Sequence, residues 1–185
     1  MYDTSHTGPE PAGENTVNNF VIVDGAADLI AFLTEVFDAT ENTDARSPDF
    51  FADDGTLIHA EVRIGSSTVM LADRKSDWPF TPAFTQVYVA DATETLRRAV
   101  GRGAAIVTEP SPFYGGYDIS RFIDPWHNVW WLFSPAADLE ASSQEWDEEP
   151  WETPSEPDAV YTTLLETMRG LADPRRDPAS ETSKP

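Results

Sequence analysis

The sequence contains the same strand-to-helix junction twice, about 66 residues apart. The first copy reads "VIVDGAADLIAFL" from residue 21 and the second reads "VYVADATETLRRA" from residue 87. In both copies a short run rich in β-branched and aromatic residues meets a turn and is followed by apolar residues at helical spacing. Further strand-like runs follow each helix, so the simplest organisation is two tandem β-α-β-β-β units. We therefore expect an α+β fold in which the helices cover one face of a cupped mixed sheet.

The first unit contains a hairpin with a clear alternation of apolar and polar residues. It reads "TLIHAEVRIG" and then, after a glycine-containing turn, "STVMLAD". Because alternate side chains of a strand lie on opposite faces, the two sets should separate. The expected core face carries Ile58, Ala60, Val62 and Ile64, and the opposite face carries His59, Glu61 and Arg63.

The second unit begins with the strand "FTQVYVAD" and the helix "DATETLRRAVGRG", for which Asp91 is the expected N-cap and Glu94 stands at capping-box spacing. The strand "AAIVTEP", a loop "SPFYGGY" and the hairpin "DISRFIDPWHNVWWLF" should follow. Adjacent residues of a strand cannot serve one core, so Trp130 and Trp131 must lie on opposite faces. We expect Trp130 to pack under the helices beside Leu132, and Trp131 to lie on the other face.

Composition changes at both ends of the chain. Residues 138–158 contain nine acidic residues and no basic one, which is typical of a linker, whereas "DAVYTTLLETMRGL" again has helical spacing. The expected apolar stripe of that helix is Val160, Leu164, Met168 and Leu171, widened by Tyr161 and Leu165. The expected organisation is a flexible arm (1–17), a domain (18–137) with units 18–76 and 83–135, an acidic linker (138–157), a C-terminal helix (158–171) and a tail (172–185).

The charge of the chain limits its partners. With 33 acidic and 12 basic residues the net charge is −21, so nucleic acid and anionic membranes are not expected to bind. The chain has no cysteine, which excludes disulfides and thiolate chemistry. It shows neither a long apolar run nor a signal-like start, so we expect a cytoplasmic protein.

Several motifs in this order resemble the vicinal oxygen chelate superfamily, which includes glyoxalases, bleomycin-resistance proteins and extradiol dioxygenases. The motifs are the two tandem units, "DGAADLIAFLTEVF", "HAEVRIGSSTVMLAD" and "DPWHNVWWL". They are most similar to the PhnB-like branch, over about residues 18–135. The resemblance implies a glyoxalase-like fold, a small-molecule site in the cup and a homodimer.

The resemblance also implies where a divalent metal would be held. The corresponding positions fall near Asn18, Met70, Phe84 and Trp131, and the last three are not usual ligands. We therefore predict that no metal cofactor is bound. An alternative is one divalent ion on a rearranged site that includes the His-x-Glu pair His59 and Glu61. Arg63 on the same face favours instead a polar network among the three side chains.

The expected cup is rich in aromatic side chains, which favour a planar organic ligand. The predicted ligand-binding residues are Asn18, Phe20, His59, Glu61, Arg63, Met70, Phe84, Gln86, Tyr88, Trp131 and Phe133. The leading hypothesis is a metal-independent binding protein of the sequestration or resistance type.

Three alternatives remain open at this point. In the first, a lyase, isomerase or dioxygenase uses His59 and Glu61 as acid and base or as metal ligands. In the second, these side chains fill the cup themselves, or the cup is buried by the C-terminal helix or a second subunit. In the third, the acidic segment and that helix bind a partner.

Overall fold

The computed structural model describes residues 15–48, 52–136 and 158–175. The chain divides into two compact units, Met1–Trp78 and Pro79–Pro185, which we describe separately. Most of the expected arm and all of the expected acidic linker lie outside the described residues.

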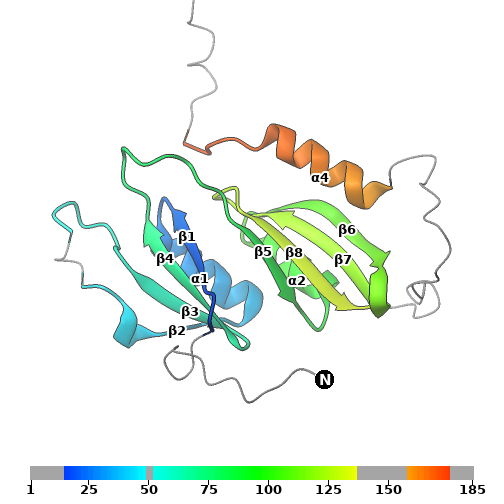
Figure 1. The fold of residues 1–185 in the computed structure, drawn as a ribbon, viewed down its shortest axis with the longest axis horizontal. Helices are drawn as coiled ribbons and strands as arrows, with labels where there is room; N and C mark the ends of the chain where they lie inside the picture. Colours follow the sequence, from blue (N-terminus) through cyan, green and yellow to red (C-terminus); the bar gives the residue numbers. More distant parts are fainter. Residues whose placement is uncertain (1–14, 49–51, 137–157, 176–185) are drawn as a thin grey trace, which may run out of the picture. The chain divides into compact units, whose positions relative to one another are not determined.

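The first unit is a four-stranded mixed sheet with one helix (Figure 1). Its strand order is β1-β4-β3-β2, in which β1 and β4 are parallel and the other pairs are antiparallel. Helix α1 buries Leu29, Phe32 and Leu33. The elements are β1 (Asn19–Val23), α1 (Ala26–Phe37), β2 (Thr40–Glu41), the 3-10 helix η1 (Thr43–Ala45), β3 (Ala60–Ile64) and β4 (Ser67–Asp73).

The second unit repeats this topology. Its strand order is β5-β8-β7-β6, again with one parallel pair, β5 and β8. The elements are β5 (Phe84–Tyr88), α2 (Ala92–Gly101), β6 (Ala105–Phe113), the 3-10 turn η3 (Tyr114–Gly116), β7 (Tyr117–Ile123), β8 (Val129–Pro135) and α4 (Ala159–Gly170). The expected α+β fold with two β-α-β-β-β units and a C-terminal helix is confirmed. None of the described helices is long and apolar enough to cross a membrane.

The two equivalent helices begin in different ways. At α2 the Asp91 side chain accepts a hydrogen bond from the backbone N–H of Glu94, as its spacing predicts. Helix α1 has Gly25 at its N-cap, so it lacks a capping side chain there. The carboxylate of Asp73, at the end of β4, instead accepts from the backbone N–H groups of Gly25 and Ala26 at 3.1 and 2.6 Å. A tertiary contact thus replaces a local cap.

The turn between β7 and β8 is organised around the buried carboxylate of Asp124. Its Oδ1 accepts from the backbone N–H groups of Trp126 and Asn128, and its Oδ2 accepts from the Asn128 amide and the Trp130 indole, all at 2.9 Å. Burial raises the pKa of the Asp124 carboxyl, and these N–H donors act in the opposite direction. His127 has a positive φ of 65° in this turn. The hairpin register therefore depends on Asp124 as well as on strand pairing.

Two expectations from the sequence are wrong in detail. Ile58 lies before β3 and is exposed: the backbone N–H groups of Ile58 and His59 donate to the Ser47 hydroxyl, and the strand begins only at Ala60. The predicted loop "SPFYGGY" is partly strand, because β6 continues to Phe113. β6 contains Pro110 and Pro112, which an edge strand with register shifts can accommodate.

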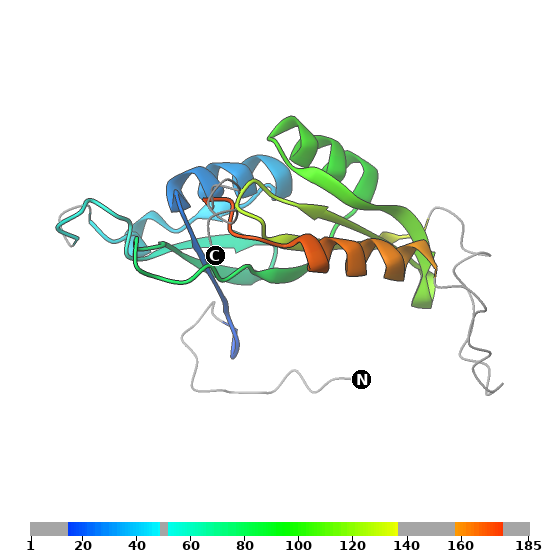
Figure 2. The same cartoon turned by 90° about the horizontal axis from the view of Figure 1, so that it is seen from above.

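Helix α4 runs beside β6 and away from α2 (Figures 1 and 2). Its contacts with the sheet include a hydrogen bond between the hydroxyls of Thr163 and Thr108 at 2.7 Å, and His127 Nδ1 bonds to the carbonyl of Ala172 just beyond the helix. The predicted apolar stripe is buried only in part: Val160, Leu164, Leu165 and Leu171 are half-buried, whereas Tyr161 and Met168 are exposed. Polar contacts to the sheet orient this helix.

We expect Asp124→Asn to lower the free energy of unfolding by about 3 kcal/mol, because the amide group cannot accept from all the buried N–H donors. Urea titration followed by tryptophan fluorescence measures the change. Asp91→Asn is the matched control, since asparagine also caps helices and should change stability by only a few tenths of a kcal/mol. Equal effects of the two substitutions would show that Asp124 does not organise the turn.

We expect Thr163→Val to weaken the docking of α4, because it removes the hydroxyl that bonds to Thr108. A net loss of about 1 kcal/mol in the docking free energy of α4 corresponds to about fivefold faster amide hydrogen exchange in this helix. Thr162→Val is the control, because the Thr162 hydroxyl bonds to the carbonyls of Asp158 and Ala159 within its own segment. Exchange that speeds up equally in both variants would mean that helix propensity, rather than docking, is responsible.

Candidate functional site

In the first unit, the sheet face opposite α1 carries a row of predicted site residues. Phe20 of β1 pairs with Met70 of β4, which in turn pairs with Glu61 of β3. Their neighbours Val21 and Leu71 are buried on the α1 side. The alternation inferred from the sequence therefore holds, and Phe20, Met70 and Glu61 share one face.

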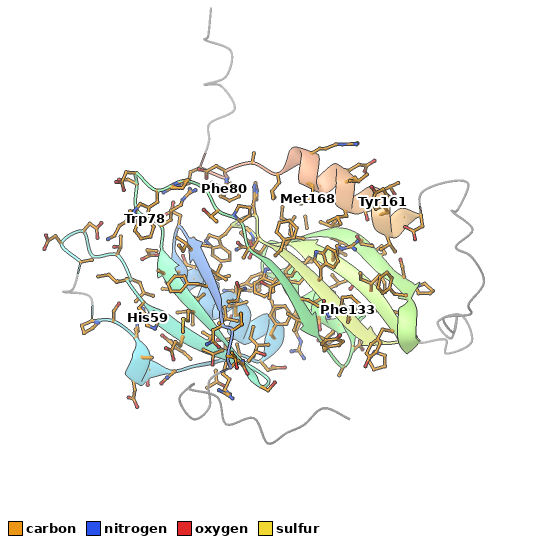
Figure 3. The ribbon with its side chains drawn as sticks, in the orientation of Figure 1. His59, Trp78, Phe80, Phe133, Tyr161 and Met168 are labelled. Atoms are coloured by element: carbon orange, nitrogen blue, oxygen red, sulfur yellow. The ribbon has the colours of Figure 1, made fainter. Side chains whose placement is uncertain are left out.

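His59 and Glu61 form a side-chain pair on this face. His59 Nε2 lies 3.1 Å from Glu61 Oε1, and the amide of Asn42 donates to Glu61 Oε2 at 3.1 Å. The Phe20 ring lies beside the imidazole, with centroids 6.2 Å apart (His59 is labelled in Figure 3). Arg63 donates to the carbonyl of Ser66 within the hairpin. The pair could move a proton, since an imidazole oriented by a carboxylate is the usual arrangement for general acid and base work.

In the second unit, strands β5 and β8 present their predicted site residues on one face. The parallel register pairs Phe84 with Val129, Gln86 with Trp131 and Tyr88 with Phe133. On the opposite face Trp130 is fully buried and its indole stacks on Phe122, with centroids 6.2 Å apart. The two adjacent tryptophans thus separate as predicted: Trp130 belongs to the core and Trp131 to the open face.

Four aromatic rings gather at one end of this face. The ring of Tyr88 lies 5.6 Å from those of Phe133 and Tyr117, and Phe113 lies 5.7 Å from Phe133 (Phe133 is labelled in Figure 3). Tyr88 is 66% exposed, so the cluster can be reached from solvent. We call Phe113, Tyr117, Tyr88 and Phe133 the ring cluster. Large exposed apolar side chains that gather in one place commonly mark a binding site.

Arg121 of β7 lies over the indole of Trp131. The guanidinium carbon is 4.1 Å from the ring centroid, a cation–π distance, and the two residues are direct strand partners. Arg121 Nη1 donates to the carbonyl of Val160 in α4 at 2.7 Å and to the hydroxyl of Thr108 at 3.2 Å. Burial lowers the pKa of Arg121, and the charge of Asp158 opposes this. The N-terminal turn of α4 therefore covers a positively charged part of the face.

The positions at which the resemblance places a metal do not suit one. Phe84 and Trp131 offer no lone pair to a divalent ion, and Met70 offers only a thioether. Within the described ranges, no three His, Asp or Glu side chains come together in a way that could hold a metal ion. His59 and Glu61 supply two donors, and two donors alone hold a metal weakly.

Sequence reasoning missed three residues of the second face: Arg121, Tyr117 and Phe113. Extending the alternation from Trp131 across the hairpin would have found Arg121 and Tyr117, because β7 and β8 are antiparallel partners. Phe113 was missed because the two prolines before it predicted a loop. Asn18 precedes β1, where its amide donates to the carbonyl of Asn15.

Comparisons with known proteins agree with this architecture. Residues 15–132 match the family model of the Glyoxalase/Bleomycin resistance protein/Dioxygenase superfamily. An uncharacterised protein of Mycobacterium tuberculosis is 32% identical over 148 residues, covering 74% of this chain and 82% of that protein. A Mycobacterium bovis protein, also uncharacterised, is 32% identical over 137 residues, covering 68% of this chain and 87% of its own length.

Solved structures with the same fold are more distant in sequence. The fosfomycin resistance protein FosX of Listeria monocytogenes aligns with a TM-score of 0.52 and 17% identity, over 69% of this chain and 97% of that one. A glyoxalase/bleomycin resistance protein/dioxygenase family enzyme of Burkholderia phytofirmans aligns with a TM-score of 0.52 and 17% identity, over 64% of this chain and 97% of that one. The tandem units and the family match together identify the chain as a member of the Glyoxalase/Bleomycin resistance protein/Dioxygenase superfamily.

Proposed function

We propose that this protein binds a small aromatic organic molecule without a metal ion, and acts by sequestration rather than by turnover. The observation that carries the proposal is the ring cluster on the open face of the second sheet. Its rings are already arranged edge to face and tilted, which leaves aromatic surface available for a further planar ring. Phe84, also exposed, extends this surface along β5.

The chemistry of the face supports a planar ligand in particular. Gln86 pairs with Trp131 between Phe84 and Tyr88, so one amide lies among the rings. Sites for small molecules typically combine apolar and aromatic walls with a few polar groups that set orientation. The likeness to FosX is at the level of fold, so the ligand class is inferred from the rings of this chain.

We expect Tyr88→Ala to raise the dissociation constant of a bound aromatic probe about tenfold, because one stacking partner is lost. Isothermal titration calorimetry with neutral and anionic fused bicyclic aromatic compounds measures this dissociation constant. Trp78→Ala is the control, since it removes an exposed aromatic ring of the first unit. If no member of such a panel changes the tryptophan fluorescence or the melting temperature, the binding function is wrong.

A second candidate function is general acid and base catalysis by His59 and Glu61. The specific observation in its favour is their 3.1 Å contact, with the Glu61 carboxylate held from the other side by Asn42. This arrangement orients the imidazole through its Nε2 and is compatible with an isomerase or lyase. It would act with or without a metal.

Proton exchange separates the two functions, and metal content separates the binding protein from a metal-dependent enzyme. For the binding protein, we expect less than about a tenth of an equivalent of Ni, Zn, Fe or Mn after purification without chelator, and probe affinity unaffected by EDTA. The enzyme predicts instead that a ligand incubated in D2O exchanges C–H for C–D, as followed by NMR. That exchange should be lost in Glu61→Gln and kept in Glu166→Gln.

A further inference from the structure

Arg121 is a buried cation whose hydrogen-bond partners among the described residues are neutral groups. Arg121 is only 3% exposed. Its guanidinium group contacts the Trp131 ring, the Thr108 hydroxyl and the Val160 carbonyl. Across the described part of the chain, no Asp or Glu forms an ion pair with it, and its Nε is buried without a hydrogen-bond partner. A guanidinium with no carboxylate partner in the part of the chain that the structure describes therefore needs an explanation.

Burying an unpaired charge is unfavourable, and proteins normally neutralise it with a carboxylate. The chain has 33 acidic residues, so carboxylates are not scarce. Asp158 acts on Arg121 through space, while its Oδ1 caps α4 by accepting from the backbone N–H of Tyr161 at 2.8 Å. The guanidinium thus retains unused capacity to bind an anion.

We propose that Arg121 selects an aromatic carboxylate, and that the first turn of α4 occupies the place of that carboxylate in the unliganded protein. The inference rests on the proposed binding function and names its ligand class. A guanidinium donates two parallel hydrogen bonds to a carboxylate, a stronger arrangement than its single bond to the Val160 carbonyl. The Trp131 indole beneath the guanidinium gives the aromatic part of the ligand a neighbouring surface.

The docking of α4 is suited to displacement. No residue of this helix is fully buried, and its contacts with the sheet include single hydrogen bonds from Arg121 to Val160 and between Thr163 and Thr108. Asp158 brings a negative charge near the guanidinium, which is what an anionic ligand would do. Helix and ligand therefore compete for one cation, and ligand affinity is reduced by the fraction of molecules in which the helix is docked.

The experiment compares 2-naphthoate with 2-naphthamide, which differ in charge and little in shape, by isothermal titration on the full chain. We expect the wild type to bind the carboxylate at least about tenfold more tightly. Arg121→Gln should make the two affinities nearly equal. Arg97→Gln, which removes an exposed arginine paired with Glu94 on α2, should leave the preference intact.

Asp158→Asn tests the competition without touching the sheet. Asparagine retains the N-cap but removes the competing charge. We expect naphthoate to bind several-fold more tightly and naphthamide to bind as before. This variant also keeps the proposal testable if Arg121→Gln does not fold.

Three outcomes would overturn the inference. If the wild type binds 2-naphthoate and 2-naphthamide with equal affinity, the protein binds aromatic molecules but does not select an anion. A preference that survives in Arg121→Gln, or that does not increase in Asp158→Asn, would place the selecting group or the competitor elsewhere. Binding of neither probe, together with a failed aromatic panel, would overturn the proposed function itself.

Discussion

The carboxylate of Asp124 is the interaction on which the second unit depends. By accepting from four N–H groups it closes the turn between β7 and β8 and ties the Trp130 indole to that turn. With Trp130 fixed in the core, strand alternation places Trp131 on the opposite face. The same register places Arg121 directly beside Trp131. One buried acid therefore sets both the packing of the core and the chemistry of the open face.

That chemistry differs from what a metal site needs. Aromatic side chains stand at two of the positions where the superfamily resemblance implies ligands, and a cation lies against one of them. A guanidinium stacked on an indole disfavours a second cation and favours an anion or a ring. The first unit contributes a different kind of group, an imidazole held by a carboxylate, on its own sheet face. Each unit thus carries a polar feature on the face opposite its helix α1 or α2.

Local rules predicted much of the fold. Alternation separated Trp130 from Trp131 and placed Phe20, Met70 and Glu61 on one face, because the two-residue period of a strand is a property of the backbone. The Asp91 cap was equally local. Sequence reasoning did not reach features that a distant partner decided: Asp73 of the neighbouring strand β4 caps α1, and β6 continues through two prolines because it is an edge strand.

The sequence by itself determined the two tandem units, their strand-to-helix junctions and the faces on which most of the candidate site residues lie. Periodicity carries that information, and it needs no knowledge of distant contacts. Only the tertiary structure decided which face of α4 meets the sheet, because the Thr163 hydroxyl and the Val160 carbonyl find partners there that no spacing reveals. It alone also showed a buried arginine with no carboxylate partner within the described ranges, since charge pairing depends on which strands and helices become neighbours in space.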